Sequence, residues 1–180
     1  MVELSLNILD IAQNGIKAGA SLVEISVLQA GNVMNIAVRD NGCGMTAEQV
    51  AQVTDPFYTT RTTRPVGLGV PFFKMSAEMT GGSFSIESMV GEGTITTAVY
   101  QTESIDMMPL GDMAATMVSL IAVNPDLDFT YTYGIGEHSF TLDTRDIKVT
   151  MEGIPIESPE ILAFIGDYIR ENTCEIKMKG

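Results

Sequence analysis

Apolar residues recur at two different spacings along the N-terminal part of the chain, and each spacing predicts a different element. In some segments they return every three or four positions, which is typical of an amphipathic helix. In others they alternate with polar residues, which is typical of a strand with one buried face. We therefore expect helices over residues 3–17 and 69–79, a short helix that begins at a Thr46 cap, and strands over 23–28, 34–40, 83–88 and 94–100. Residues 55–66 show no periodicity, and we expect a mobile loop there.

The pattern changes beyond residue 105, where shorter periodic segments follow one another. It predicts a helix over 113–123, strands over 129–133, 139–142 and 147–151, and a last helix that starts after Pro159 and ends near Asn172. The order of elements in the N-terminal part indicates the α+β class, with a two-layer α/β sandwich and a mixed sheet. We expect residues 1–104 to form this domain and residues 105–180 to form a small α+β appendage whose role the sequence does not reveal.

Composition narrows the partners that this chain of 180 residues can have. It carries 23 acidic and 10 basic residues, a net charge of −13. Nucleic acids and anionic membrane surfaces both favour clustered lysine and arginine, so we expect neither as a partner. The two cysteines give no metal-ligand spacing. No apolar run is long enough to cross a membrane and no signal peptide is visible, so we expect a cytoplasmic protein.

A short polar motif, Asp40-Asn41-Gly42-Cys43-Gly44-Met45, follows a predicted strand. Asp40 has the parity of the apolar positions of residues 34–38, so its carboxylate points to the interior, where an unpaired charge is costly. The exocyclic amine of adenine is a suitable donor for it. Gly42 and Gly44 would let the backbone turn and approach a ligand closely. Taken alone, the motif could equally be an ordinary Asn-Gly turn.

Three polar residues of the first helix, Asp10, Asn14 and Lys17, share one face. An amide oxygen can ligate Mg²⁺, and an ammonium one turn further can neutralise a phosphate. The alternative is a solvated polar face.

The segment Gly67-Leu68-Gly69 precedes a predicted helix, whose N-terminus favours an anion. Upstream, Arg61 and Arg64 could close over phosphates or could be surface charges. Thr94 could bond a base or a bridging water near Asp40, or it could satisfy itself locally.

Taken in order, these motifs resemble the GHKL, or Bergerat-fold, superfamily of ATPases, and in particular the histidine-kinase-like ATP-binding domain. The resemblance covers roughly residues 3–100. The face of Asp10, Asn14 and Lys17 looks like the N-box, and residues 40–45 look like the adenine-recognition box. Residues 55–61 resemble the phenylalanine box, Gly67-Leu68-Gly69 the glycine box, and Gly93-Thr94 the closing Gly-Thr. The whole chain bears a looser likeness to ATP-binding proteins associated with iron-only hydrogenase systems.

The resemblance implies a role for each of these positions. Asp40 would bind the adenine amine with the help of Thr94, and Asn14 would hold Mg²⁺. The nucleotide-binding residues implied in this way are Asn14, Lys17, Asp40, Gly42, Gly44, Met45, Arg61, Arg64, Gly67, Leu68, Gly69 and Thr94. Asp10 stands where hydrolytic members carry a glutamate that activates water, so weak hydrolysis is an option.

Three functions are open at this point. The first is a stand-alone switch that binds Mg·ATP, with at most weak ATPase activity. The second is a protein kinase that acts in trans on a serine or histidine of a partner, as anti-sigma-factor kinases and split histidine kinases do. The third is a degenerate scaffold that only binds protein. A protein partner is expected in each case, and a homodimer is one option for the assembly.

Overall fold

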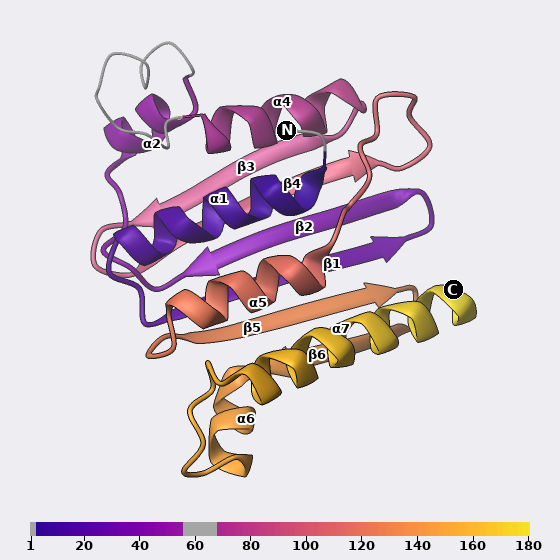
Figure 1. Cartoon of the computed structure of the whole chain (residues 1–180). Coiled ribbons are helices and arrows are strands. Elements are labelled where there is room, and N and C mark those ends of the chain that lie inside the picture. Colours follow the sequence, from indigo (N-terminus) through magenta and orange to yellow (C-terminus); the bar gives the residue numbers. More distant parts are fainter. Residues whose placement is uncertain (1–2, 56–67) are drawn as a thin grey trace.

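The computed structural model describes residues 3–55 and 68–180. Its helices are α1 (Leu4–Lys17), α2 (Ala47–Val53), α4 (Gly69–Met79), α5 (Met113–Val123), α6 (Thr144–Thr150) and α7 (Pro159–Lys179) (Figure 1). Its strands are β1 (Leu22–Ala30), β2 (Val33–Asp40), β3 (Ser83–Met89), β4 (Gly93–Gln101), β5 (Asp128–Ile135) and β6 (His138–Asp143).

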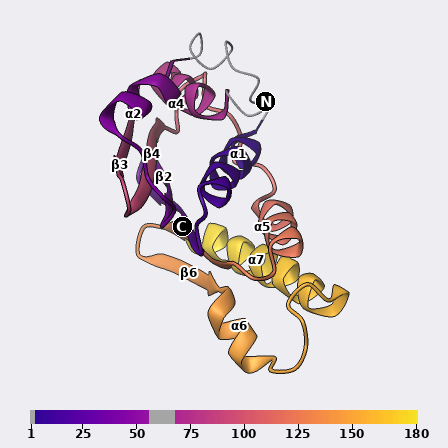
Figure 2. The same ribbon diagram turned by 90° about the vertical axis from the view of Figure 1, so that its left-hand side faces the viewer.

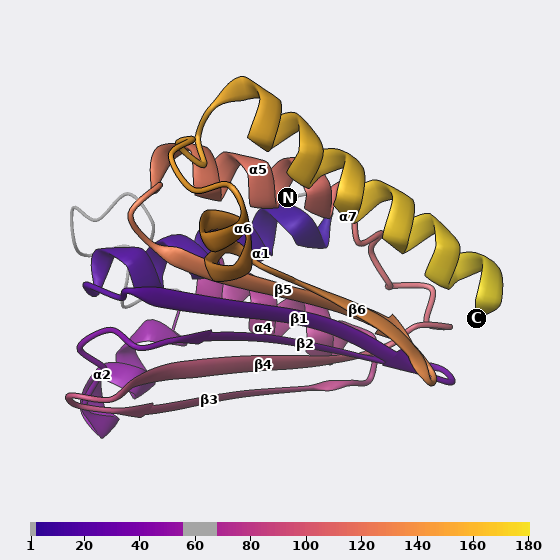
Figure 3. The same cartoon turned by 90° about the horizontal axis from the view of Figure 1, so that it is seen from below.

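The strands form one six-stranded sheet in the order β3-β4-β2-β1-β5-β6. All neighbours are antiparallel except β1 and β5, which run parallel with Leu22 opposite Asp128 at one end and Gln29 opposite Ile135 at the other. Helices α1, α4, α5 and α7 gather on one face of this sheet (Figures 2 and 3). The predicted two-layer α/β sandwich with a mixed sheet is confirmed.

The hydrophobic core fills the space between the helices and the sheet. Each of the four covering helices contributes a side chain that is at most 1% exposed, namely Ile8, Phe73, Leu120 and Ile165. Alternate residues of the strands meet them from the sheet, because successive side chains of a strand point to opposite faces. Burial of this apolar surface is the main force that holds the two layers together.

The C-terminal segment continues the same sheet. Strand β5 joins the edge that β1 would otherwise expose, and α5 packs against both α1 and α7. The first turn of α1 is tied to the connecting segment, since the backbone N–H of Leu4 donates to the Pro109 carbonyl at 3.0 Å and that of Ser5 to the Leu110 carbonyl at 2.7 Å. The division into residues 1–104 and 105–180 stays a prediction, but the sheet itself is continuous.

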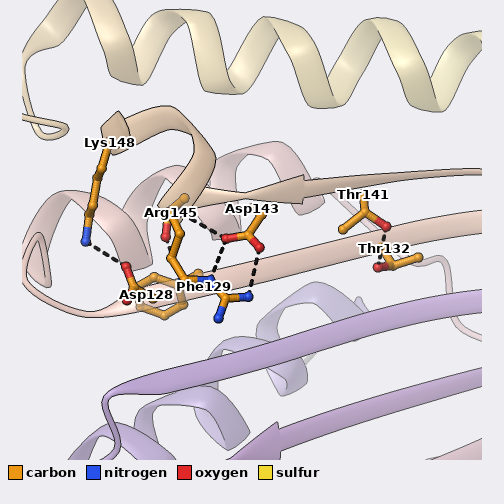
Figure 4. Close-up of polar contacts among 8 residues, drawn as sticks. Asp128, Phe129, Thr132, Thr141, Asp143, Arg145 and Lys148 are labelled. Atoms are coloured by element: carbon orange, nitrogen blue, oxygen red, sulfur yellow. Dashed lines mark hydrogen bonds and ion pairs between the residues drawn. The ribbon is translucent and has the colours of Figure 1, made fainter. Parts of the chain in front are cut away.

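The strand expected over residues 147–151 is wrong, because helix α6 occupies this place. The Asp143 carboxylate accepts a bond from the backbone N–H of Arg145 at 2.9 Å and caps the helix (Figure 4). The Lys148 ammonium then ties α6 to the start of β5 through the Leu127 carbonyl (2.9 Å) and the Asp128 carboxylate (3.0 Å). The last helix also runs beyond the expected end near residue 172, to Lys179.

Candidate functional site

A cavity of about 350 Å³ opens beside the C-terminal half of α1. Its walls come from α1, the end of β2 and the loop after it, α2, the start of α4, and the strands β3 and β4. The residues that line it are Ile11, Asn14, Lys17, Ala18, Asp40, Gly44, Met45, Val53, Val70, Ile86, Thr94 and Thr96. Six of the predicted nucleotide-binding residues lie on this wall, namely Asn14, Lys17, Asp40, Gly44, Met45 and Thr94.

Asp40 and Thr94 lie directly opposite each other on the antiparallel strands β2 and β4, and both face the cavity. One carboxylate oxygen of Asp40, Oδ1, accepts a bond from the backbone N–H of Gly42 at 2.8 Å. Burial raises the pKa of Asp40, and the backbone N–H groups of Gly42 and Thr94 offset this only in part. Within the described residues the carboxylate has no ion-pair partner.

Asp40 therefore keeps acceptor capacity for a ligand. An ionised carboxylate can accept roughly four hydrogen bonds, and the backbone donors of Gly42 and Thr94 take part of this capacity. A carboxylate that is half-buried, faces a cavity and lacks a cation is suited to an N–H donor from a bound molecule.

The loop after Asp40 is held in shape by backbone contacts on both sides. Gly44 adopts a φ of +74°, and a side chain there would collide with the carbonyl of Met89. The Cys43 backbone donates to the Ala18 carbonyl at 2.9 Å and accepts from the Gly91 N–H at 2.7 Å. The loop is thus clamped between the end of α1 and the β3–β4 turn, and only glycine fits at position 44.

Ser88 on β3 joins this loop to the closing strand, and the sequence alone did not single it out. Its hydroxyl accepts a bond from the Met45 backbone N–H at 2.7 Å and lies 2.7 Å from the Thr94 hydroxyl. It also donates to the Gly93 carbonyl at 3.0 Å. Ser88 shares the parity of Ile86, a residue of the cavity wall, and this parity is the signal that could have found it.

Asn14 and Lys17 lie on the α1 side of the cavity. Neither side chain makes a hydrogen bond or ion pair that involves the described residues, so the amide oxygen and the ammonium are available. The described part of the chain holds no group of three or more His, Cys, Asp or Glu residues that could bind a metal. The Asn14 amide oxygen is a suitable ligand for Mg²⁺, and phosphates and water would supply the other ligands.

The remaining predicted residues lie outside the cavity wall. Asp10 packs on Gly69 at the start of α4, where a Cβ would come within 2.9 Å of its carboxylate. Burial raises the pKa of Asp10, and the positive charge of Lys17 opposes this. Gly42 packs against Ala18 at the end of α1. Leu68 is exposed. Arg61, Arg64 and Gly67 lie outside the described residues.

The apolar walls of the cavity were not among the predicted site residues. Ile11 comes from α1, Val53 from α2, Val70 from α4 and Ile86 from β3. A cavity with apolar walls and a polar pair at one end fits a flat, partly apolar ring with a polar edge. Thr96 follows Thr94 at the same parity, and Ile11 precedes Asn14 on α1, so position on these elements could have suggested both.

Comparison with known proteins agrees with this geometry. Residues 2–104 match the family model described as histidine kinase-, DNA gyrase B-, and HSP90-like ATPase. The chain belongs to this family. The match spans the candidate site, and it supports nucleotide binding by the chain.

The curated relatives are similar over the same part of the chain. Sporulation kinase C of Bacillus subtilis is 33% identical over 98 residues, which are 53% of this chain and 23% of the relative. The signal transduction histidine-protein kinase AfsQ2 of Streptomyces coelicolor is 34% identical over 88 residues, 47% of this chain and 16% of the relative. The matched part thus spans less than a quarter of the length of these two relatives.

Among solved structures, the N-terminal domain of a DNA repair protein aligns with a TM-score of 0.57 at 12% identity, over 87% of this chain and 59% of that chain. This similarity concerns the fold alone. In the described part of the chain, no helix combines the length and the apolar character that a membrane crossing needs.

Proposed function

We propose that this chain is a Mg·ATP-dependent switch with at most weak ATPase activity. The observation that carries the proposal is the Asp40–Thr94 pair at one side of the cavity, with Asn14 and Lys17 on the α1 wall. The side chains of Asn14 and Lys17 make no hydrogen bond or ion pair with a described residue. A carboxylate suits the amine edge of adenine, and an amide beside an ammonium suits a magnesium–triphosphate.

In this proposal the nucleotide lies along the cavity from β4 towards α1. Asp40 accepts from the 6-amino group of adenine, and Thr94 supports that contact. Asn14 contributes an oxygen to Mg²⁺, while Lys17, Arg61 and Arg64 contact the phosphates. Gly69 begins α4, so the phosphates and the N-terminus of that helix attract each other. The difference between the nucleotide-bound and the free protein is the switch that a partner would detect.

Asp10 is the candidate for slow turnover. Its carboxylate packs against Gly69 at the start of α4, and burial raises its pKa. A base with a raised pKa takes a proton from water more readily, provided that the water lies within hydrogen-bond reach. Hydrolysis would reset the switch.

The discriminating experiment is a melting-temperature measurement with Mg·ATP and with Mg·GTP. A ligand that binds the native state must raise its stability. Guanine carries an oxygen where adenine carries the amine, and Asp40 would repel it. We expect Mg·ATP to raise the melting temperature and Mg·GTP to leave it nearly unchanged. No shift with Mg·ATP would remove the proposal and leave the scaffold function, and equal shifts would remove the role of Asp40.

A second candidate is a protein kinase that acts in trans, because the curated relatives named above are kinases by name. The chain has one histidine, His138, which opens β6 and is exposed. The test is transfer of label from γ-labelled ATP to a partner protein. Transfer to the partner favours the kinase, and release as free phosphate favours the switch.

Four further points remain proposals: a protein partner, a homodimer, a cytoplasmic setting and the link to hydrogenase systems.

A further inference from the structure

A second cavity, of about 700 Å³, lies at the other end of α1, between α5, α7 and β5. Helices α5 and α7 lie side by side over β5 (Figures 1 and 3). Apart from Glu3, the residues that line this cavity belong to the segment after residue 104, which the family model does not cover. The walls include apolar side chains of Leu110, Met113, Ile169 and Met178.

Tyr131 of β5 forms part of the wall and is fully buried. It shares the buried parity of Phe129 and Tyr133, so its side chain lies on the face of the sheet that the helices cover. This hydroxyl has no hydrogen-bond partner in the part of the chain that the structure describes. Burial raises the pKa of Tyr131, so the hydroxyl stays protonated and can donate at neutral pH. An unpaired buried hydroxyl destabilises a fold. The hydroxyl itself is closed off from solvent, so a ligand in the cavity reaches it only when a neighbouring side chain moves.

The acidic and the basic side chains around the cavity differ in the contacts that they make within the chain. The acidic side chains have donors: Glu3 accepts from the Ser5 hydroxyl at 3.0 Å, and Asp112 from the Ala115 N–H at 2.9 Å. The basic side chains have fewer contacts. Arg170 forms one long ion pair, with Asp167 at 3.7 Å, and Lys177 makes no ion pair with a described residue. The N-terminus of α5 also borders the cavity, and the Asp112 carboxylate already caps it.

We propose that this cavity is a second binding site, for a small carboxylic acid with an apolar aryl or alkyl body. Arg170 and Lys177 hold the carboxylate, the Tyr131 hydroxyl donates to it or to a polar group beside it, and the apolar wall covers the body of the ligand. The site does not depend on the proposed nucleotide function. Helix α1 borders both cavities, with Glu3 at one end and Asn14 and Lys17 near the other.

The first test uses phenylacetate and octanoate as probes, with phenylacetamide and octanamide as uncharged counterparts, in calorimetric titrations. We expect saturable binding of at least one carboxylate and binding of its amide that is about tenfold weaker or more, because a charge-assisted contact is lost. If neither carboxylate binds saturably, or if the amides bind equally well, the proposal is overturned.

Variants then locate the site. Lys177→Gln and Arg170→Gln should each weaken the carboxylate about tenfold. Lys179→Gln is the matched control on the same helix, since Lys179 pairs with Glu175 at 3.1 Å and does not line the cavity; it should bind like the wild type. If all three variants bind the carboxylate as tightly as the wild type does, the proposal is overturned.

Tyr131→Phe separates a ligand contact from a structural role. Removal of an unpaired buried hydroxyl should raise the melting temperature, while it weakens the carboxylate severalfold. A lower melting temperature with unchanged carboxylate affinity would mean that the hydroxyl serves the fold, and would contradict this part of the proposal.

Discussion

Carboxylates at strand ends have different surroundings in the two halves of the sheet. At the end of β6, Asp143 is neutralised by Arg145, whose Nε lies 3.0 Å from Oδ1 and whose Nη2 lies 2.8 Å from Oδ2 (Figure 4). At the end of β2, Asp40 has a backbone donor at 2.8 Å and no cation among the described residues. The pKa of Asp143 is lowered, chiefly by its hydrogen bond with Arg145, and that of Asp40 is raised, chiefly by burial.

The difference separates a structural carboxylate from one that awaits a ligand. Asp143 caps α6 and lowers the free energy of the folded chain, because its partner is part of the chain. Asp40 raises the free energy of the folded chain, because no part of the chain described here supplies a positive partner. Asp40 faces a cavity, so its missing partner can come from outside. Binding sites often carry charged groups that have no partner within the protein, and these groups lower its stability.

The largest expected effect concerns Asp10, the second carboxylate with a raised pKa and no ion pair to a described residue. Asp10→Asn should lower ATP hydrolysis about 100-fold or more, because the general base is lost, with little change in nucleotide affinity. Phosphate release and calorimetry measure the two quantities. Asp106→Asn, at an exposed position, is the matched control. Equal hydrolysis by Asp10→Asn and the wild type would place Asp10 with the structural carboxylates.

Gly44→Ala tests whether backbone contacts, rather than ion pairs, hold the Asp40 loop. The change forces an alanine into a φ of +74° and against the Met89 carbonyl, so the free energy of unfolding should fall by about 3 kcal/mol. Gly19→Ala is the control, because Gly19 has a similar φ of +84° with open space around it, and it should lose only about 1 kcal/mol. Urea unfolding measures both, and equal losses would contradict the clamp.

The smallest expected effect is a difference in the pH dependence of stability. The folded-state pKa of Asp40 lies above its unfolded value, so ionised Asp40 destabilises the fold at neutral pH, and this cost disappears as pH falls through the folded pKa. Asp40→Asn should therefore stabilise the protein at pH 7 by about 0.5 kcal/mol or less, and the gain should vanish in acid.

Asp143→Asn is the counterpart and should do the reverse. Its pKa is lowered, so it contributes stability above its unfolded pKa and loses that contribution as pH falls through the folded pKa. The variant should be destabilised at pH 7 and match the wild type in acid. Unfolding curves at a series of pH values check both variants, and shifts of the same sign would remove the distinction between Asp40 and Asp143.

The local parts of the fold and site could be predicted from the sequence, and the long-range parts could not. Asp40 was found because it continues the parity of an alternating strand and because Gly42 and Gly44 follow it. The α1 face was found from helical spacing. Pairing of β1 with β5 was not visible, because alternation tells which face a residue takes and not which strand lies beside it.

One wrong prediction and one residue that the sequence did not point to have definite causes. Residues 147–151 alternate as a strand does, but the Asp143 cap and the Lys148 contacts favour a helix there. Tyr131 looks like an ordinary core residue at a buried parity. Its unpaired hydroxyl appears only when its neighbours are known, because a missing partner is a property of the packed structure.

A thermodynamic cycle measures the Asp40–adenine contact most directly. The affinities of ATP and of purine riboside triphosphate, which lacks the 6-amino group, are compared by calorimetry in the wild type and in Asp40→Asn. We predict that loss of the amine weakens binding about tenfold or more in the wild type and about threefold or less in the variant, because a neutral acceptor gains less from the amine. An equal loss in both proteins, or no loss in the wild type, would contradict the account.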